Sequence, residues 1–339
     1  MSTITWLHLS DLHLRGTETS VDRGTFNDML SDIEERLEEE GLNLDAVFFT
    51  GDVAFSGQVE QYEQATERLD EILEACGLSG QRNRFFIVPG NHDVDRGEVN
   101  RTKGICRLHE DNAKDLLDPD KPYGEINEFL GPDPDRELVF AKFQNFARFI
   151  DMFFSDEEIK FDYNRYYFVR SIDKEGHTVV VIGLNSAWLS FRDNEQGQLL
   201  LGERQVCDAI EEAKRKWPDA CLRIALVHHP LYWLAEKDIH KVQQHLPRKC
   251  DLLLRGHLHC PSFSVQSTPD SHLHVFAAGA SLKANYHAYN FVQLDLDTGE
   301  GTAIVRLQHP EIGGNWGADS FTYRNAKEGK IALSLVLGK

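Results

Sequence analysis

Long apolar runs are missing from this sequence of 339 residues. The most apolar stretches, 179–184 and 331–337, are far shorter than the roughly 20 residues of a membrane-spanning helix, so we expect no membrane span. The N-terminus lacks the basic segment and apolar core of a signal peptide, and none is expected. The six cysteines are scattered and form no Cys-x-x-Cys pair, which predicts reduced thiols in a cytoplasmic protein rather than a disulfide framework.

Basic residues are also in short supply. Lys and Arg number 36 against 55 Asp and Glu, which gives a formal net charge of −19. A generic binder of the nucleic-acid backbone needs a basic surface, so this balance disfavours nucleic acid but leaves room for a local basic groove. Walker-type and Gly-x-Gly-x-x-Gly loops are absent, and Gly183-Leu184-Asn185-Ser186 lacks the second glycine of a nucleophile elbow. NTP binding, dinucleotide binding and serine-hydrolase chemistry are therefore unsupported. Histidine, in contrast, is abundant, with 15 residues beside 6 Cys and 3 Met.

The first hundred residues alternate between strand-like and helix-like patterns. Apolar segments at Ile4–Leu9, Leu44–Phe49 and Arg84–Val88 predict strands, and the amphipathic segments Val21–Glu40 and Gln58–Cys76 between them predict helices. This β-α-β-α-β order predicts an α/β fold with a largely parallel sheet and crossover helices.

The rhythm breaks at residues 97–163, a more polar stretch with helical patterns at Gly104–Leu117 and Glu137–Phe154. We expect this stretch to be a helical insertion or cap within a single domain that covers residues 1–339. Downstream, we expect a helix at Glu203–Lys216. Further strands are predicted at 165–172, 177–184, 222–227, 251–254, 273–277, 291–295, 302–308 and 330–337.

Polar side chains that can bind metals follow five of the predicted strands at their carboxyl ends. In an open α/β sheet this edge is where ligands bind, so we expect these side chains to come together there. The residues concerned are Asp11, His13, Asp52, Asn91, His92, Asp93, His228, His257 and His259.

The residue types indicate the kind of site. Imidazole, carboxylate and amide groups without a thiolate suit divalent Mn, Fe, Zn or Co, and we favour Mn or Fe. Seven candidate ligands exceed what one four-coordinate ion requires, so we expect two ions with Asp52 as the bridging carboxylate. Such a pair suits in-line displacement at phosphorus, in which a bridging water loses a proton and attacks as hydroxide.

A leaving oxygen needs a proton, and His92 is the candidate general acid. It directly follows the candidate ligand Asn91 and should point into the same site. We expect Asp93 to hydrogen-bond to the imidazolium form of His92 and to raise its pKa.

Two arginines and several histidines allow more than one interpretation. Arg15 and Arg255 lie beside candidate ligands and could contact substrate phosphate, but a structural ion pair is at least as good an explanation. Histidines without a motif around them, His109 among them, are expected at the surface.

Together these blocks resemble the motifs of the calcineurin-like metallophosphoesterases. The family pattern is Asp-x-His, Gly-Asp, Gly-Asn-His-(Asp/Glu), His and Gly-His-x-His, and all five blocks occur here in order across residues 11–259. The resemblance implies a four-layer αββα sandwich of two mixed β-sheets flanked by helices. It implies one metal held by Asp11, His13, Asp52 and His259, and another held by Asp52, Asn91, His228 and His257. We choose His228 over its neighbour His229 because His228 is the first residue out of its strand.

The sequences of two segments narrow the resemblance to one branch of the family. Residues 51–57 and His228-His229-Pro230 are similar to the cyclic-nucleotide phosphodiesterase branch of the family. We therefore predict a metal-dependent phosphodiesterase that hydrolyses a small phosphodiester, with a cyclic nucleotide as the first guess. A nuclease or nucleotide phosphatase on the same metal core is the alternative. A regulatory module with a vestigial metal centre is a third hypothesis, which the complete ligand set disfavours. The sequence does not indicate an oligomeric state.

Overall fold

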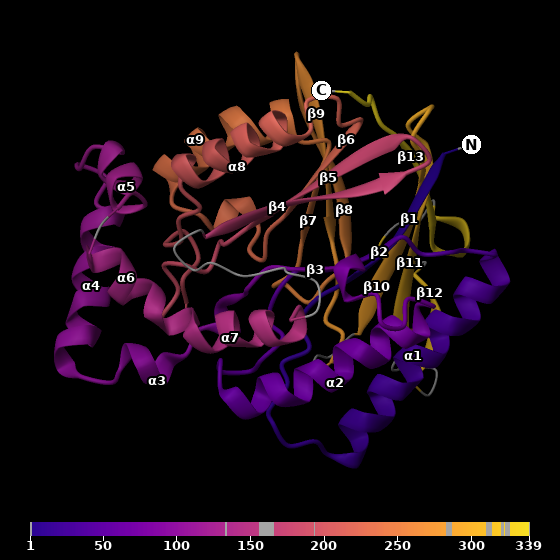
Figure 1. Cartoon of the computed structure of the whole chain (residues 1–339), viewed down its shortest axis with the longest axis horizontal. Helices are drawn as coiled ribbons and strands as arrows, with labels where there is room; N and C mark the ends of the chain where they lie inside the picture. The colour runs from indigo at the N-terminus through magenta and orange to yellow at the C-terminus, as the bar shows by residue number, and fades with distance from the viewer. Residues whose placement is uncertain are drawn as a thin grey trace.

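Two mixed β-sheets lie face to face, with helices on their outer faces, in the computed structural model (Figure 1). This arrangement confirms the predicted four-layer αββα sandwich. The structure describes residues 2–132, 134–155, 166–192, 194–282, 287–309, 314–319, 322 and 326–338.

The larger sheet has seven strands in the order β12-β11-β10-β1-β2-β3, with β13 paired to β11. Strands β1, β2 and β3 are parallel, as the β-α-β-α-β pattern predicts, whereas β10 pairs with β1 in the antiparallel sense. The strands are β1 (Thr3–Leu9), β2 (Ala46–Phe49), β3 (Phe85–Ile87), β10 (Ala288–Asp295), β11 (Glu300–His309), β12 (Asn315–Ala318) and β13 (Lys330–Ser334).

The smaller sheet has six strands in the order β4-β5-β6-β7-β9-β8. Its central strands β5, β6, β7 and β9 are parallel, and β4 and β8 close its edges in the antiparallel sense. The sequence patterns did not predict β8 and placed the start of β4 at residue 165, which lies outside the described residues. The strands are β4 (Tyr167–Lys174), β5 (His177–Leu184), β6 (Leu222–Leu226), β7 (Leu252–Arg255), β8 (Ser262–Thr268) and β9 (Ser271–Ala277).

Two pairs of helices form the outer layers. Helices α1 (Ser20–Glu40) and α2 (Val59–Ala75) cover the larger sheet, and α8 (Glu203–Lys216) and α9 (Glu236–Lys249) cover the smaller one (Figure 1). Helix α1 begins after Thr19, whose side chain accepts the backbone N–H of Asp22 in a capping box. It ends at Gly41, whose φ of 62° is the left-handed conformation that glycine adopts readily at helix ends.

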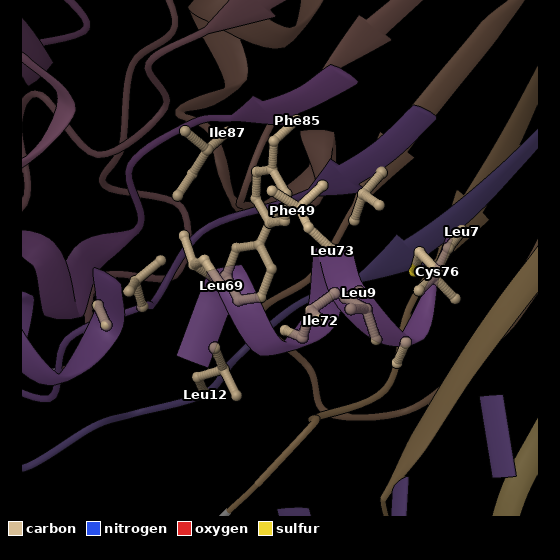
Figure 2. Close-up of a cluster of buried hydrophobic side chains, with 14 of the residues drawn as sticks. Leu7, Leu9, Leu12, Phe49, Leu69, Ile72, Leu73, Cys76, Phe85 and Ile87 are labelled. Atoms are coloured by element: carbon tan, nitrogen blue, oxygen red, sulfur yellow. The ribbon is translucent and has the colours of Figure 1, made fainter. Parts of the chain in front are cut away.

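The core follows the alternation of side chains along the strands. In β1, Trp6 faces the smaller sheet, whereas Leu7 and Leu9 face the helices. Figure 2 shows the helix-facing side, where Phe49 and Phe85 of the sheet pack on the apolar face of α2. Each of these side chains is almost completely buried, so the sandwich has an apolar layer between its sheets and another under each helix pair.

The stretch predicted as a helical insertion does contain helices, although residues 133 and 156–163 lie outside the described part. The single helix predicted at Glu137–Phe154 is interrupted, because the 3₁₀ turn η3 (Ala141–Phe143) separates α6 from α7. Side chains of α3, α4, α5 and α6 pack around Trp188, whereas α7 packs on α2 in the core of the larger sheet. That these helices form a cap within one domain stays a prediction. The helices are α3 (Arg96–Val99), α4 (Lys103–Leu117), α5 (Gly124–Phe129), α6 (Pro134–Phe140) and α7 (Gln144–Phe153).

Two negative predictions concern the whole chain. Across the described ranges, the structure contains no helix with the length and apolar character needed to cross a bilayer. All six cysteines fall within these ranges and are free thiols, as the sequence predicts.

His109 on α4 is not at the surface, contrary to the sequence-based expectation, because only 2% of it is exposed. Burial, with a smaller contribution from the charge of Lys142, lowers the pKa of His109 from 6.5 to about 3. As the pH falls below 6.5, His109 therefore takes up a proton in the unfolded chain but stays neutral in the folded chain. The folded state loses stability on acidification for this reason.

Replacing His109 by Leu should remove part of this acid sensitivity. Between about pH 7.5 and about pH 5, the wild type should lose about 2 kcal/mol more free energy of unfolding than the variant. Urea unfolding of both proteins at the two pH values measures this difference. An equal loss in both proteins would show that His109 is protonated in the folded state at pH 5.

Candidate metal centre

The carboxyl ends of five strands from both sheets meet at one edge of the sandwich. Residues after β1, β2 and β3 come from the larger sheet, and residues after β6 and β7 come from the smaller one. Of the eight non-glycine residues with positive φ in the described part of the chain, five are predicted ligands. Because L-residues adopt this conformation at a cost and such outliers cluster at functional sites, the turns are built to aim these side chains. The five are Asp11, His13, Asp52, His257 and His259.

One group of ligand atoms lies around Asp11. The Nε2 atoms of His13 and His259 are 3.1 Å apart. The Oδ1 atom of Asp11 lies 3.3 Å from His259 Nε2 and 3.6 Å from His13 Nε2. Asp11 is completely buried, and its Oδ1 atom has no hydrogen-bond partner among the described residues.

A second group lies around the Oδ1 atom of Asn91. His228 Nε2 and His257 Nδ1 are each 3.1 Å from this oxygen and 3.2 Å from each other. The Nε2 atom of His229 lies 3.2 Å from the same oxygen. The structure therefore brings both candidates of the His228-His229 pair to Asn91.

Asp52 joins the two groups. Its Oδ2 atom lies 3.2 Å from His228 Nε2 in one group and 3.9 Å from His13 Nε2 in the other. Its Oδ1 atom accepts the backbone N–H of His92 at 2.8 Å. One carboxylate oxygen thus fixes the turn after β3, and the other lies between the two groups.

The spacing and the donor types fit divalent metal ions. Ligand atoms about 2.0–2.2 Å from one ion lie about 3–3.6 Å apart in octahedral or tetrahedral geometry. The contacts around Asn91, and those of Asp11 Oδ1, fall in or close to this range. The buried Oδ1 atom of Asp11 makes no hydrogen bond among the described residues, and a divalent cation would satisfy it.

The pKa shifts within the cluster also favour a bound cation. Burial disfavours the cation of His228, but the adjacent Asp52 carboxylate outweighs burial and raises the pKa of His228 to about 9. Burial likewise opposes the ionisation of Asp52, yet His228 holds the pKa of Asp52 well below its usual value. A proton on His228 thus balances the buried negative charge, and a divalent cation would take over that role as the proton leaves.

The glycines beside the ligands allow this crowding. Gly51 has a φ of 96°, and a Cβ on it would lie 2.6 Å from His228 Nδ1. A Cβ on Gly90 would lie 2.2 Å from Asp52 Oδ1. Since real side chains do not tolerate such contacts, both positions need glycine for the strand-end turns to approach one another.

His92 lies at the edge of the cluster, with its ring centroid 4.6 Å from that of His13. Its Nδ1 atom is 2.7 Å from the carbonyl oxygen of Phe55. A carbonyl oxygen only accepts, so Nδ1 carries the hydrogen and Nε2 is the atom that can gain or lose a proton.

Asp93 does not contact the His92 imidazole, contrary to the sequence-based expectation. Its carboxylate accepts the backbone N–H groups of Gly90, Asp52 and Ala54 at 2.9–3.0 Å and the hydroxyl of Tyr62 at 3.2 Å. Burial, reinforced by the charge of Asp52, raises the pKa of Asp93 to about 6. The physical reason is local: η2 (Asn91–Asp93) turns successive side chains in different directions, so Asp93 supports the Asp52 turn instead.

Three further side chains border the cluster. Arg255 is buried and donates to Gly256 O and Ser262 Oγ, which agrees with a structural role. Arg15 is exposed, and its guanidinium lies 3.9 Å from the ring centre of Phe55. Sequence reasoning missed Trp233, whose ring centre is 4.1 Å from that of His257. Its position shortly after His228-His229-Pro230 is the signal that could have drawn attention to it.

Comparisons with known proteins found one family model and several similar proteins. The family model described as calcineurin-like phosphoesterase matches residues 4–261. The uncharacterized metallophosphoesterase-like protein YydB of Bacillus subtilis (strain 168) is 27% identical over 334 residues, which are 97% of this chain and 64% of YydB. A cAMP/cGMP dual specificity phosphodiesterase of Mycobacterium tuberculosis (strain CDC 1551 / Oshkosh) is 33% identical over 99 residues, 28% of each protein.

Among solved structures, the 5′-nucleotidase precursor from Thermus thermophilus superposes with a TM-score of 0.44 at 15% identity. The match covers 99% of this chain and 55% of that chain. This chain spans less than two thirds of the length of each of these three proteins.

Proposed function

Because the chain belongs to the calcineurin-like phosphoesterase family, we propose that it is a phosphodiesterase that uses two divalent metal ions to hydrolyse a small phosphodiester. The observation that carries the proposal is the convergence of two groups of nitrogen and oxygen ligands on opposite sides of Asp52. One ion would be held by Asp11, His13, Asp52 and His259, and the other by Asp52, Asn91, His228 and His257. Mn²⁺ or Fe²⁺ suits this thiolate-free set.

The bound ions would supply Lewis acidity toward the phosphodiester oxygens and lower the pKa of water to near neutrality. The remaining chemistry falls to side chains of the chain itself. His92 Nε2, left free by the Nδ1 contact to Phe55 O, would donate a proton to the leaving oxygen. Asp93 keeps the Asp52 turn in place through its backbone contacts and acts only through that turn.

The substrate class rests on similarity and charge. The relative that covers 99 residues is a cAMP/cGMP phosphodiesterase, and a net charge of −19 favours a small phosphodiester over a long polyanion. We propose that residues 97–163, the predicted helical insertion, shape access to the site.

Hydrolysis of bis(p-nitrophenyl) phosphate by the purified protein with Mn²⁺ tests the proposal. We expect release of p-nitrophenolate that EDTA abolishes and added Mn²⁺ restores. The monoester p-nitrophenyl phosphate is the control, because preferential turnover of the monoester would favour a phosphatase. No turnover of either compound with Mn²⁺, Fe²⁺, Zn²⁺ or Co²⁺ in a folded protein would refute the proposal.

A substrate panel then separates the alternatives. Cyclic nucleotides, dinucleotides and single-stranded DNA should be compared by kcat/KM under the same metal conditions. We expect the cyclic nucleotides to give the highest values. A preference for single-stranded DNA would instead make the protein a nuclease.

A further inference from the structure

His228 and His229 are neighbours that reach the same oxygen of Asn91, yet their other ring nitrogens meet different partners. The Nδ1 atom of His228 lies 2.7 Å from the carbonyl oxygen of Thr50. The Nδ1 atom of His229 lies 3.0 Å from the hydroxyl oxygen of Ser186. Both histidines are completely or almost completely buried, so these contacts decide where their hydrogens lie.

The hydroxyl of Ser186 has only one way to meet its partners. The backbone N–H groups of His228 and His229 both donate to its Oγ atom, at 3.3 and 3.0 Å. Those two donors occupy the two lone pairs of the oxygen, so the hydroxyl hydrogen must be donated. The remaining neighbour is Nδ1 of His229, which therefore accepts.

The opposite holds for His228. The carbonyl of Thr50 can only accept, so Nδ1 of His228 carries a hydrogen and Nε2 is the nitrogen that can offer a lone pair to a metal. In neutral His229, Nδ1 has no hydrogen, so Nε2 carries one and has no lone pair to offer. The 3.2 Å contact from this Nε2 to Asn91 Oδ1 is then a donated hydrogen bond.

We propose that His229 is a positioning residue that donates from Nε2 to Asn91 and turns the amide oxygen toward the metal, with Ser186 fixing the required tautomer. The inference rests on the metal centre of the proposed function but does not depend on the substrate. It assigns opposite roles to two adjacent histidines that a distance criterion alone places in one ligand group. It also gives Ser186, 40 or more residues from either histidine, a specific part in the site.

Titration of the metal-free protein with Mn²⁺ tests the role of His229. The variant His229→Leu should still bind two ions, but the dissociation constant of one should rise about 10–100-fold. His229→Gln, whose amide can donate in place of Nε2, should restore most of that affinity. His228→Gln is the matched control and should lose one ion altogether. Calorimetry gives the dissociation constants, and elemental analysis gives the number of ions.

Two results would overturn the proposal. If His229→Leu binds both ions as tightly as the wild type, His229 positions nothing. If both His229 variants lose one ion in the same way as His228→Gln, then His229 is itself a ligand.

The tautomer can be measured without any metal, which separates this inference from the metal centre. Long-range ¹H–¹⁵N correlation spectra of protein labelled with ¹⁵N-histidine distinguish a protonated from an unprotonated ring nitrogen. The signal of His229 is assigned as the one that disappears in His229→Gln. In the wild type it should show Nδ1 without a hydrogen. Ser186→Ala should shift it toward the other tautomer. A protonated Nδ1 in the wild type would contradict the assignment.

Discussion

Substituting Asp52 by Asn should reduce kcat/KM for a phosphodiester on the order of 10⁴-fold, which corresponds to about 5 kcal/mol of lost transition-state stabilisation. Asn keeps the shape of the side chain and can still accept the backbone N–H of His92. It cannot supply the charged oxygen that lies between His228 and His13. The variant should therefore bind fewer Mn²⁺ ions and remain folded. Activity near the wild-type level would rule out the bridging role.

Asp32→Asn is a matched control for this substitution. Asp32 is also a buried carboxylate, but it lies on α1 and contacts Arg306 and the hydroxyl of Tyr289 rather than the cluster. Because this change weakens a buried ion pair, it should lower the melting temperature and leave the specific activity of the folded protein unchanged. The two variants should thus separate loss of chemistry from loss of stability. Thermal unfolding and Mn²⁺ content, measured alongside activity, test this contrast.

Substituting His92 by Gln should lower kcat about 10²–10⁴-fold for a substrate with a poor leaving group, such as a cyclic nucleotide. The effect should be much smaller for bis(p-nitrophenyl) phosphate, because p-nitrophenolate leaves without needing a proton. Mn²⁺ stoichiometry should not change, since His92 contributes a general acid and no ligand in the proposed mechanism. The dependence of kcat on leaving-group pKa, compared between wild type and variant, measures the effect.

The alternative to His92 as general acid is His92 as a metal ligand. His92 lies with His13 and Asp52 in a group that could itself hold an ion. If His92→Gln lost an ion and slowed both substrates equally, His92 would be a ligand rather than the acid. Retained Mn²⁺ with equal slowing of both substrates would also count against proton donation.

Local patterns in the sequence predicted most of the strands and helices, whereas the four-layer arrangement followed only from the family resemblance. Apolar strand patterns mark β1 and β5, and the boundaries of α8 match the predicted helix. Helix α9 escaped prediction, because its apolar residues are few and a proline lies inside it. Val242 and Leu246 of α9 are nevertheless buried against the smaller sheet, so tertiary packing rather than propensity stabilises this helix.

The candidate site was also predicted only in part: the sequence indicated its ligands but not the contacts that orient them. Short motifs placed the side chains that the structure brings together, because a residue just past a parallel strand has to lie at the carboxyl edge. The contacts that orient those side chains were beyond reach, since they use the carbonyl oxygens of Thr50 and Phe55 and the hydroxyl of Ser186. A motif does not show which way such a carbonyl or hydroxyl group points, because its direction is set by how distant turns meet. Asp93 was misjudged for that reason.

The origin of the ligands in both sheets has a mechanical consequence. Each proposed ion would take ligands from the turns after β1, β2 or β3 in one sheet and from the turns after β6 or β7 in the other. The ions would therefore link the two sheets at one edge. Away from that edge, the apolar layer between the sheets is their main contact. Releasing the ions would remove this link and leave two buried carboxylates with only a proton on His228 as nearby counter-charge. Unfolding should then begin at the edge that carries the proposed active site. Metal loading would therefore set the lifetime of the folded state as well as the activity.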